Sequence, residues 1–538
     1  MNINQKIGAD AFYLAGYTGS RSIVVNIEAG NAWNGHESLE HVQTFLQHPD
    51  AGTFAGGQLG QSDFHATWVA SALAGRPGGA SPGERQRGLA FGATLWSGAI
   101  AGSFVSGTTN FNITNNAHFR NPYRRAMISG ADDSGNGPTA DVVNSAWLTG
   151  SINSGNDYFT LYLDAAAKAS GKTIVLPAGN RGPANGISSP ASGFNSICAG
   201  ALGSNGLQFD QVANFSSRGS VSFQNPATGA IPGTRARVDI LAPGDDLKLA
   251  YYGGSTGGNA GLPDPTGGAN NHYADFRQGT EFASAIVAGA AALIVDYAKD
   301  KYSANAKSWD ARVVKAVLLN SADKIAGWSN NMLPGAGGVT LTTQALDLTR
   351  GAGALNLNRA FEQFRAGADR TNGTGVGGAP GTGGAVKAVG WDYGNVTSTA
   401  ARNYIIDQTL LGGTTLTVTL NWFANRTAGF GDGDTSTFDA SFVNLDLEVW
   451  RVVGGVMTAM VSTSKTSFSN TEHLHLLLGA DGDYAIRVKW TGFLYNRVGD
   501  PSNIDYGLAW YATAVPAPGV TLSFMAGLAT LACSRRRR

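Results

Sequence analysis

Four polar residues border apolar segments, where side chains are well placed to react. Glu28 follows the apolar run SIVVNI, His65 opens the segment HATWVASALAG, Asn180 ends the run KTIVLPAGN, and Glu281 precedes the long apolar segment 282–300. An acid and an imidazole can exchange protons, and an amide can donate a hydrogen bond to a developing oxyanion. Each residue alone has an ordinary explanation, because an Asn before a turn commonly serves the turn. Whether these residues have a catalytic role therefore depends on the helices and strands that position them.

Alternating segments predict an α/β unit in the N-terminal part of the chain. Strand-like and helix-like segments occupy residues 22–30, 65–75, 140–148, 157–171, 172–180, 282–300 and 309–322. Buried strands that alternate with helices indicate a mostly parallel sheet covered on both faces. The segment 282–300 is apolar on nearly all sides, which indicates a buried central helix. Active sites in such sheets lie at the carboxyl ends of the strands, where Glu28 and Asn180 are found.

The pattern changes after residue 365. A Gly-rich stretch is followed by TTLTVTLNWFA, VNLDLEVWRVV, HLHLLLG and DYAIRVKW, which alternate apolar and polar residues. Gly-rich composition is typical of a linker, and alternation between turns is typical of a β-sandwich or jelly roll. We predict an α/β domain over 1–365, a linker over 366–385, an all-β domain over 386–513 and a tail over 514–538.

The composition restricts the class of protein. Lys plus Arg and Asp plus Glu both number 38, so the net charge is +0, which argues against a nucleic acid as partner. Only 14% of the residues are charged, and 74 of 538 are Gly. This balance favours a loop-rich extracellular protein. The two cysteines, Cys198 and Cys533, exclude a disulfide framework.

In chain order, the four polar residues lie in segments that resemble the motifs of the subtilisin-like serine peptidases, the subtilases. VVNIEAG is similar to the acid motif with Glu28 in place of Asp, and HATWVAS to the His motif with His65 as base. LPAGNRG is similar to the oxyanion motif with Asn180 as donor, and GTEFASAIVAG to the nucleophile motif G-T-S-M-A-S-P-x-V-A-G. The order acid, His, nucleophile is that of subtilisin. FSSRGS, VDILAPGDDL and GAGALNLNRA extend the resemblance over about residues 5–365.

The resemblance implies a subtilisin-like parallel sheet flanked by helices and the activity of a serine-type endopeptidase. It also implies that Ser145, Ala146 and Trp147 of VVNSAWLTG form a wall of the peptide-binding cleft. NLDLEVW and SNTEHLHLLLGADGDYAIRV resemble β-sandwich domains of the prepeptidase C-terminal type. No cofactor is expected to be required. GDGDTSTFD at residues 431–439 offers carboxylates for a structural Ca²⁺, although a solvated acidic turn is the simpler interpretation.

Glu281 departs from the motif at the position of the nucleophile. A carboxylate is a weak nucleophile, its attack on an amide gives an unstable mixed anhydride, and its charge opposes the oxyanion of the tetrahedral intermediate. Ser284, one helical turn later, matches a family serine that is not the nucleophile. We therefore expect conventional acyl-enzyme catalysis to be lost, with Glu281 held by a helix N-terminus and by Asn180. His65 would lie between two carboxylates, which raises its pKa.

Three other functions fit the same residues. Glu281 could activate water while Asn180 polarises the carbonyl, as a Glu and an amide do in glutamic peptidases of another fold. Glu28, His65 and Glu281 could bind a metal ion, although we expect a protein-only ion network because no further ligands are evident. The last is a non-enzymatic binding or scaffold protein at the cell surface.

The C-terminus AVPAPGVTLSFMAGLATLACSRRRR combines a Pro-containing break, an apolar run and a basic end. The run is shorter than the roughly 20 residues of a spanning helix, and a basic end fits retention with the arginines in the cytoplasm. The pattern resembles the PEP-CTERM sorting tag of exported bacterial proteins, with Ala517 where the tag has Glu. We expect export, transient anchoring in the membrane, a leader upstream of the first residue, and a polypeptide and a sorting machinery as partners.

Overall fold

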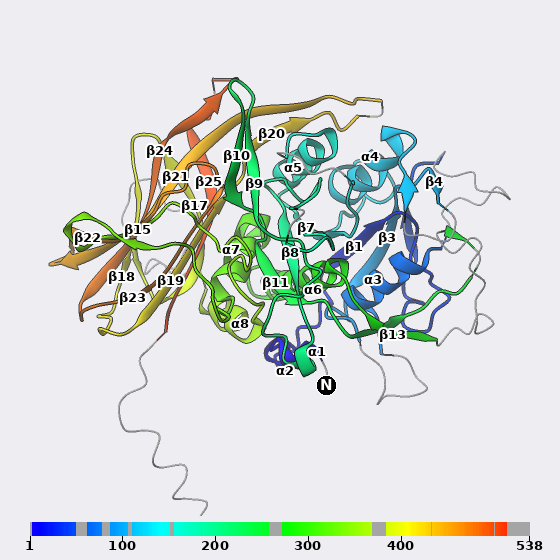
Figure 1. Cartoon of the computed structure of the whole chain (residues 1–538), viewed down its shortest axis with the longest axis horizontal. Helices are drawn as coiled ribbons and strands as arrows, with labels where there is room; N and C mark the ends of the chain where they lie inside the picture. Colours follow the sequence, from blue (N-terminus) through cyan, green and yellow to red (C-terminus); the bar gives the residue numbers. More distant parts are fainter. Residues whose placement is uncertain are drawn as a thin grey trace, which may run out of the picture.

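The computed structural model of the chain describes residues 3–49, 62–77, 87–105, 110–150, 155–183, 186–254, 256–257, 272–367, 384–431, 433–499 and 501–513. An α/β body that contains the N-terminus lies beside a β-rich body formed by the C-terminal strands (Figure 1). Most of the predicted linker and the whole predicted tail lie outside the described residues. The sorting tag and the domain boundaries therefore stay predictions.

A seven-stranded sheet forms the centre of the α/β body, in the order β11-β8-β7-β6-β1-β3-β2. All neighbours in it pair in parallel. The strands are β1 (Ile23–Glu28), β2 (Thr44–Leu46), β3 (Thr94–Ala99), β6 (Val142–Ser145), β7 (Thr173–Pro177), β8 (Ile197–Leu202) and β11 (Ile240–Pro243). The five strands from β8 to β3 are buried along most of their length, as expected where helices cover the sheet. The predicted parallel sheet is confirmed.

The predicted central helix is α6 (Thr280–Lys301), which packs against β6, β7, β8 and β11. Small residues let it approach its neighbours closely: a Cβ at Gly289 would lie 2.8 Å from the Cβ of Leu89. Among the described residues α6 is the one helix long and apolar enough to cross a membrane, but 94% of its most apolar window is buried. Its composition thus reflects its place in the core.

Further helices pack around the sheet and around α6. They are α3 (Phe64–Ala74) against α6 and β1, α4 (Asn116–Arg124) against β3, α5 (Tyr158–Ser170) against β7, and α7 (Ala311–Ser321) against α6 and β7. Short elements complete the body: α1 (Ile3–Lys6), α2 (Asp10–Leu14), β4 (Ser103–Phe104), β5 (Phe111–Asn112), β9 (Ser220–Asn225), β10 (Gly229–Ala236), β12 (Leu247–Ala250), β13 (Tyr273–Arg277), a π-helix at Arg125–Ser129 and 3₁₀ turns at Asn205–Leu207, Ala306–Trp309 and Ala336–Gly338.

The C-terminal body consists of two β-sheets. The strands are β16 (Gly384–Val386), β17 (Val389–Thr397), β18 (Arg402–Ile406), β19 (Thr415–Trp422), β20 (Asn425–Ala428), β21 (Thr437–Val453), β22 (Val456–Ser464), β23 (Thr471–Leu477), β24 (Asp483–Asn496) and β25 (Asn503–Thr513). One sheet has the order β17-β25-β19-β23, and the other contains β22-β21-β24-β18-β16 with β20 paired to β21. Apolar side chains from both sheets, among them Leu420 and Leu445, share one core cluster. The predicted all-β class is confirmed.

The two bodies are joined by more than the chain between them. β14 (Leu333–Pro334) and β15 (Thr340–Thr342) precede the predicted linker, yet β15 pairs with β22 and so extends the C-terminal sheet. On the other sheet, α7 packs against β19 and β25, and α8 (Leu357–Ala366) packs against β17. The C-terminal body therefore packs against the α/β body through both strand pairing and helices.

Candidate active site

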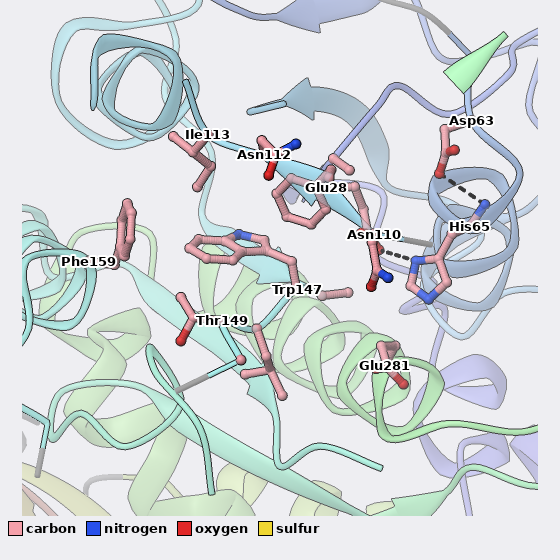
Figure 2. Close-up of a pocket in the computed structure, with 15 residues that line it drawn as sticks. Glu28, Asp63, His65, Asn110, Asn112, Ile113, Trp147, Thr149, Phe159 and Glu281 are labelled. Carbon is pink, nitrogen blue, oxygen red and sulfur yellow. Dashed lines mark hydrogen bonds and ion pairs between the residues drawn. The ribbon is translucent and has the colours of Figure 1, made fainter. Parts of the chain in front are cut away.

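The carboxyl ends of the strands bring the predicted residues to one cavity. Glu28 is the last residue of β1, and Asn180 follows the end of β7. His65 and Glu281 lie in the first turns of α3 and α6. Glu28, His65 and Glu281 line a cavity of about 570 Å³ (Figure 2), and Asn180 contacts Glu281 directly.

The acid and the base form a close pair. Nδ1 of His65 lies 3.2 Å from Oε1 of Glu28, and Glu28 is buried. Asp63 caps α3, because its Oδ2 accepts hydrogen bonds from the backbone N–H groups of His65 (3.1 Å) and Ala66 (3.2 Å). The cap fixes the helix turn that carries His65, so the imidazole faces the end of β1.

The charges around His65 favour its protonated form. Burial alone lowers the pKa of His65, but the Glu28 carboxylate, together with Glu281 and Asp63, outweighs burial and raises the pKa to about 9. Burial raises the pKa of Glu28 despite the opposing effect of the imidazolium. A base that already holds a proton at neutral pH cannot take one from a nucleophile. The imidazole of His65 is therefore mostly protonated at neutral pH, where Glu28, whose pKa is raised to about 7, is only partly ionised.

The carboxylate of Glu281 is held by the amide of Asn180. Nδ2 of Asn180 donates to Oε1 (3.0 Å) and Oε2 (2.8 Å) of Glu281. The orientation of the amide is set on its other side, where Oδ1 accepts from the backbone N–H of Thr280 (2.9 Å) and from its hydroxyl (3.0 Å). That hydroxyl in turn accepts from the N–H of Gly179 (3.0 Å). The loop after β7 and the start of α6 are thus locked together, with the amide N–H groups directed at a carboxylate.

Comparison with protein-family models matches residues 49–358 to the subtilase family. This range is more than half of the 538 residues. The chain belongs to the subtilase family. A search of the curated proteins found no match. His65, Asn180 and Glu281 of this subtilase lie within the matched range, whereas Glu28 precedes it and is placed in the site by the structure.

Ser284 has a structural contact in this subtilase. Its side chain is buried, and its hydroxyl donates to the backbone carbonyl of Glu281 at 2.8 Å. The hydroxyl is therefore directed back along α6 and away from the cavity.

Two of the three residues predicted for the cleft wall line the cavity, and the third does not. Ala146 and Trp147 line the cavity, as do Leu148, Thr149 and Gly150 after them. Ser145 does not line it, because its side chain is fully buried and hydrogen-bonded to the hydroxyl of Tyr123. The same hydroxyl accepts from Nε1 of Trp147 at 2.7 Å. Ser145 and Trp147 thus share the hydroxyl of Tyr123 as a hydrogen-bond partner.

Several lining residues were not predicted from the sequence. They are Ala29, Asp63, Asn110, Phe111, Asn112, Ile113 and Phe159. Residues 110–113 reach the cleft on β5 and its flanks, and Phe159 reaches it from the start of α5. Ile113, Trp147 and Phe159 make one end of the cavity apolar (Figure 2). The sequence carries no signal that would place these residues at the cleft.

Within the described part of the chain, no group of three or more His, Cys, Asp or Glu residues is arranged to hold a metal ion. Glu28 and Glu281 are divided between His65 and Asn180 rather than converging on one point. In the acidic stretch 431–439, Asp432 lies outside the described residues, and Oδ1 of Asp434 accepts from the N–H of Ser436 at 2.8 Å. The calcium site remains a prediction.

Proposed function

We propose that this subtilase binds polypeptide segments in its cleft without forming an acyl-enzyme. One observation carries the proposal: both oxygens of the Glu281 carboxylate accept hydrogen bonds from the amide of Asn180. In a serine peptidase the corresponding groups are a hydroxyl that attacks the carbonyl and a donor that stabilises the oxyanion. A single side chain removes the hydroxyl and occupies the donor. Acyl transfer then lacks both the attacking hydroxyl and a free oxyanion donor.

The cleft keeps the features that bind a ligand. Its volume of about 570 Å³ and its mixture of aromatic walls and polar groups fall within the range of ordinary ligand pockets. The polar groups gather around Glu28, His65 and Glu281, and the apolar groups gather around Trp147 and Phe159. A polypeptide, which offers alternating carbonyl groups and side chains, is the ligand class of the family and suits such a cleft.

The test is a peptidase assay of the wild-type chain, with labelling by a serine-directed phosphonate. We expect no cleavage of chromogenic peptides or of casein above the level of a His65→Ala control, and no label on the chain. Cleavage blocked by the phosphonate, with the chain labelled, would contradict the proposal. Cleavage that resists the phosphonate, increases toward acid pH and is lost in Glu281→Gln would contradict it too, and would show that Glu281 activates water.

Binding is tested separately from catalysis. A library of N-acetylated, C-terminally amidated peptides is titrated against the wild type and against Trp147→Ala, with Trp450→Ala as the matched control. Trp450 lies in β21 and hydrogen-bonds to Glu448 at 2.7 Å, within the C-terminal body. We expect peptides to bind the wild type and the control and to bind Trp147→Ala weakly. Peptide binding equal in all three proteins would show that the cleft is not the site.

We also propose that the chain is exported and that residues 514–538 anchor it transiently at the membrane. The support is the Pro-x-Pro break, the apolar run and the final arginines from Arg535 to Arg538. We further propose that the C-terminal strands form a module of the prepeptidase C-terminal type, because NLDLEVW and SNTEHLHLLLGADGDYAIRV resemble such modules. The test is cell fractionation of the full chain beside a variant that ends at residue 513. Membrane association of the full chain alone is expected, and an identical distribution of the two would contradict the anchor.

A further inference from the structure

A hairpin of the C-terminal body reaches across the α/β body. β20 and β21 leave the sandwich together and run over α5 toward α4 (Figure 1). At its first turn α5 carries Phe159, which lines the cleft. The hairpin thus contacts a helix that forms part of the cleft wall.

Arg426 of β20 anchors the hairpin to α5. Its fully buried guanidinium donates to the carbonyl oxygen of Gly155 at 2.6 Å and to Oδ2 of Asp164 on α5 at 2.7 Å. It also donates to Oδ2 of Asp439 on β21 at 3.2 Å. Asp164 is equally buried and accepts two backbone N–H groups before β8, both at 2.8 Å. Charge-assisted hydrogen bonds of this kind are strong and directional, so they fix the hairpin relative to α5.

The tip of the hairpin makes a second set of contacts. Arg120 on α4 donates to the carbonyl oxygens of Gly431, at 3.3 Å, and Asp434. The ring of Phe430 packs on the ring of Tyr162 on α5, with centroids 5.6 Å apart and an interplanar angle of 69°. Tyr162 is 1% exposed, so Phe430 covers a side chain that belongs to the core of the other body.

Contacts between aromatic rings continue from Tyr162 to the cleft. The ring centroids of Tyr162 and Phe119 lie 5.3 Å apart. The centroid of Phe119 lies 4.8 Å from that of Phe159 and 5.7 Å from that of Trp147. Trp147 and Phe159 lie 5.7 Å apart at the apolar end of the cavity (Figure 2). Close-packed rings cannot move independently, and Phe159 and Tyr162 are neighbours three positions apart on one helix. A displacement of Tyr162 therefore reaches both cleft residues.

We propose that Phe430 is a positioning residue for the cleft: by holding Tyr162 it sets the positions of Phe159 and Trp147. The C-terminal body then helps to determine which ligand side chain fits the apolar end of the cleft. The proposal deepens the proposed function and rests on it only for the identity of the ligand as a polypeptide. The positioning itself is a property of the ring contacts and is open to a test that needs no ligand.

The test uses the full chain labelled with 5-fluorotryptophan. The chain has 11 Trp residues, and loss of one ¹⁹F signal in Trp147→Phe assigns Trp147. Phe430→Ala is compared with Phe438→Ala, a matched control in which the same atoms are removed from a partly buried ring in β21. Phe438 packs on Arg497, whose Cζ lies 4.2 Å from its centroid. We expect the Trp147 signal to shift or broaden in Phe430→Ala, to stay in place in Phe438→Ala and to return in Phe430→Tyr, which keeps the ring.

An unchanged Trp147 signal in a folded Phe430→Ala protein would overturn the proposal, and so would equal shifts in the two alanine variants. Phe430→Leu keeps most of the buried volume and provides the same comparison if the alanine variant does not fold. In the Glu281→Ser background, Phe430→Ala is expected to raise KM for a peptide with a large aromatic residue more than it lowers kcat. If the wild type cleaves peptides through a labelled acyl-enzyme, the proposed function fails, while the ¹⁹F comparison still decides the positioning.

Discussion

The two ends of the site differ in how far they suit catalysis. At the acid–base end, Glu28 and His65 lie 3.2 Å apart and α3 presents the imidazole to the cavity. At the nucleophile end, where the sequence resembles the nucleophile motif, the carboxylate of Glu281 accepts two hydrogen bonds from the amide of Asn180. At the first end the acid and the base contact each other as in a triad, whereas at the second end Glu281 and Asn180 bind each other.

The side chain of Glu281 affects both ends of the site. Glu281 acts on the acid–base end as well, because its charge contributes to the raised pKa of His65. Under the proposed function, the carboxylate stands where a hydroxyl would attack, occupies the oxyanion donor and favours the protonated base. These three effects arise from one side chain, so exchanging it should reverse all of them together.

The largest expected effect concerns the pKa of His65. Glu28→Gln removes the carboxylate at 3.2 Å, and the pKa should fall from about 9 to below the usual 6.5 as burial becomes dominant. A change of 2 units or more corresponds to about 3 kcal/mol. Glu281→Gln should lower the pKa by less, because Glu28 is the stronger influence. Titration of the His65 ring signals by NMR measures both, and equal shifts in the two variants would contradict the division between the ends.

The next effect is the pH dependence of stability. Burial raises the pKa of Glu28 from 4.5 to about 7, and the carboxylates raise that of His65 from 6.5 to about 9. The folded state then holds more protons than the unfolded state between about pH 4.5 and pH 9, so this pair makes stability fall as pH rises across that window. Urea unfolding at pH 5 and pH 9 should show a smaller difference in Glu28→Gln/His65→Gln than in the wild type. A difference of the same size in both proteins would exclude the pair as the cause.

Thr280→Val should destabilise the protein by about 2 kcal/mol, because it leaves the buried N–H of Gly179 without its acceptor. The hydroxyl of Thr280 is fully buried and also donates to Asn180. Thr280→Ser keeps the hydroxyl and is the control, with a loss expected to be smaller. An unchanged stability of Thr280→Val in chemical denaturation would show that the hydrogen bonds of the hydroxyl do not join the loop to α6.

Asn180→Ala should have the smallest effect on stability, about 1 kcal/mol or less, because the side chain is exposed and water replaces its contacts. The same change should free the Glu281 carboxylate. Asn180→Asp is the opposite case, since it places a second carboxylate 2.8–3.0 Å from the first and should destabilise more. If Asn180→Ala costs as much as Thr280→Val, the amide has a structural role that the site alone does not explain.

Sequence and structure agree where the relevant residues are local to a motif. Glu28, His65, Asn180 and Glu281 could be grouped from the sequence, because each lies in a segment that resembles a subtilase motif and parallel strands carry active sites at their carboxyl ends. Phe159 and residues 110–113 could not, because their position depends on how distant loops and helices pack. β14 and β15 are 2 and 3 residues long, too short to show a periodicity, and their pairing with the C-terminal sheet is visible only in the fold. The hairpin contacts of Arg426 and Phe430 likewise join residues far apart in sequence.

The most direct test of the central claim is the turnover of one chromogenic peptide by Glu281→Ser beside the wild type and Glu281→Ser/Asn180→Ala. We predict no turnover by the wild type and measurable turnover by Glu281→Ser, because the substitution restores a hydroxyl, frees the amide and lowers the pKa of His65. Loss of one oxyanion donor commonly costs about 10²–10³-fold in kcat, so the double variant should lose most of the gain. Turnover by the wild type equal to that of Glu281→Ser would contradict the account, as would a double variant as active as the single one.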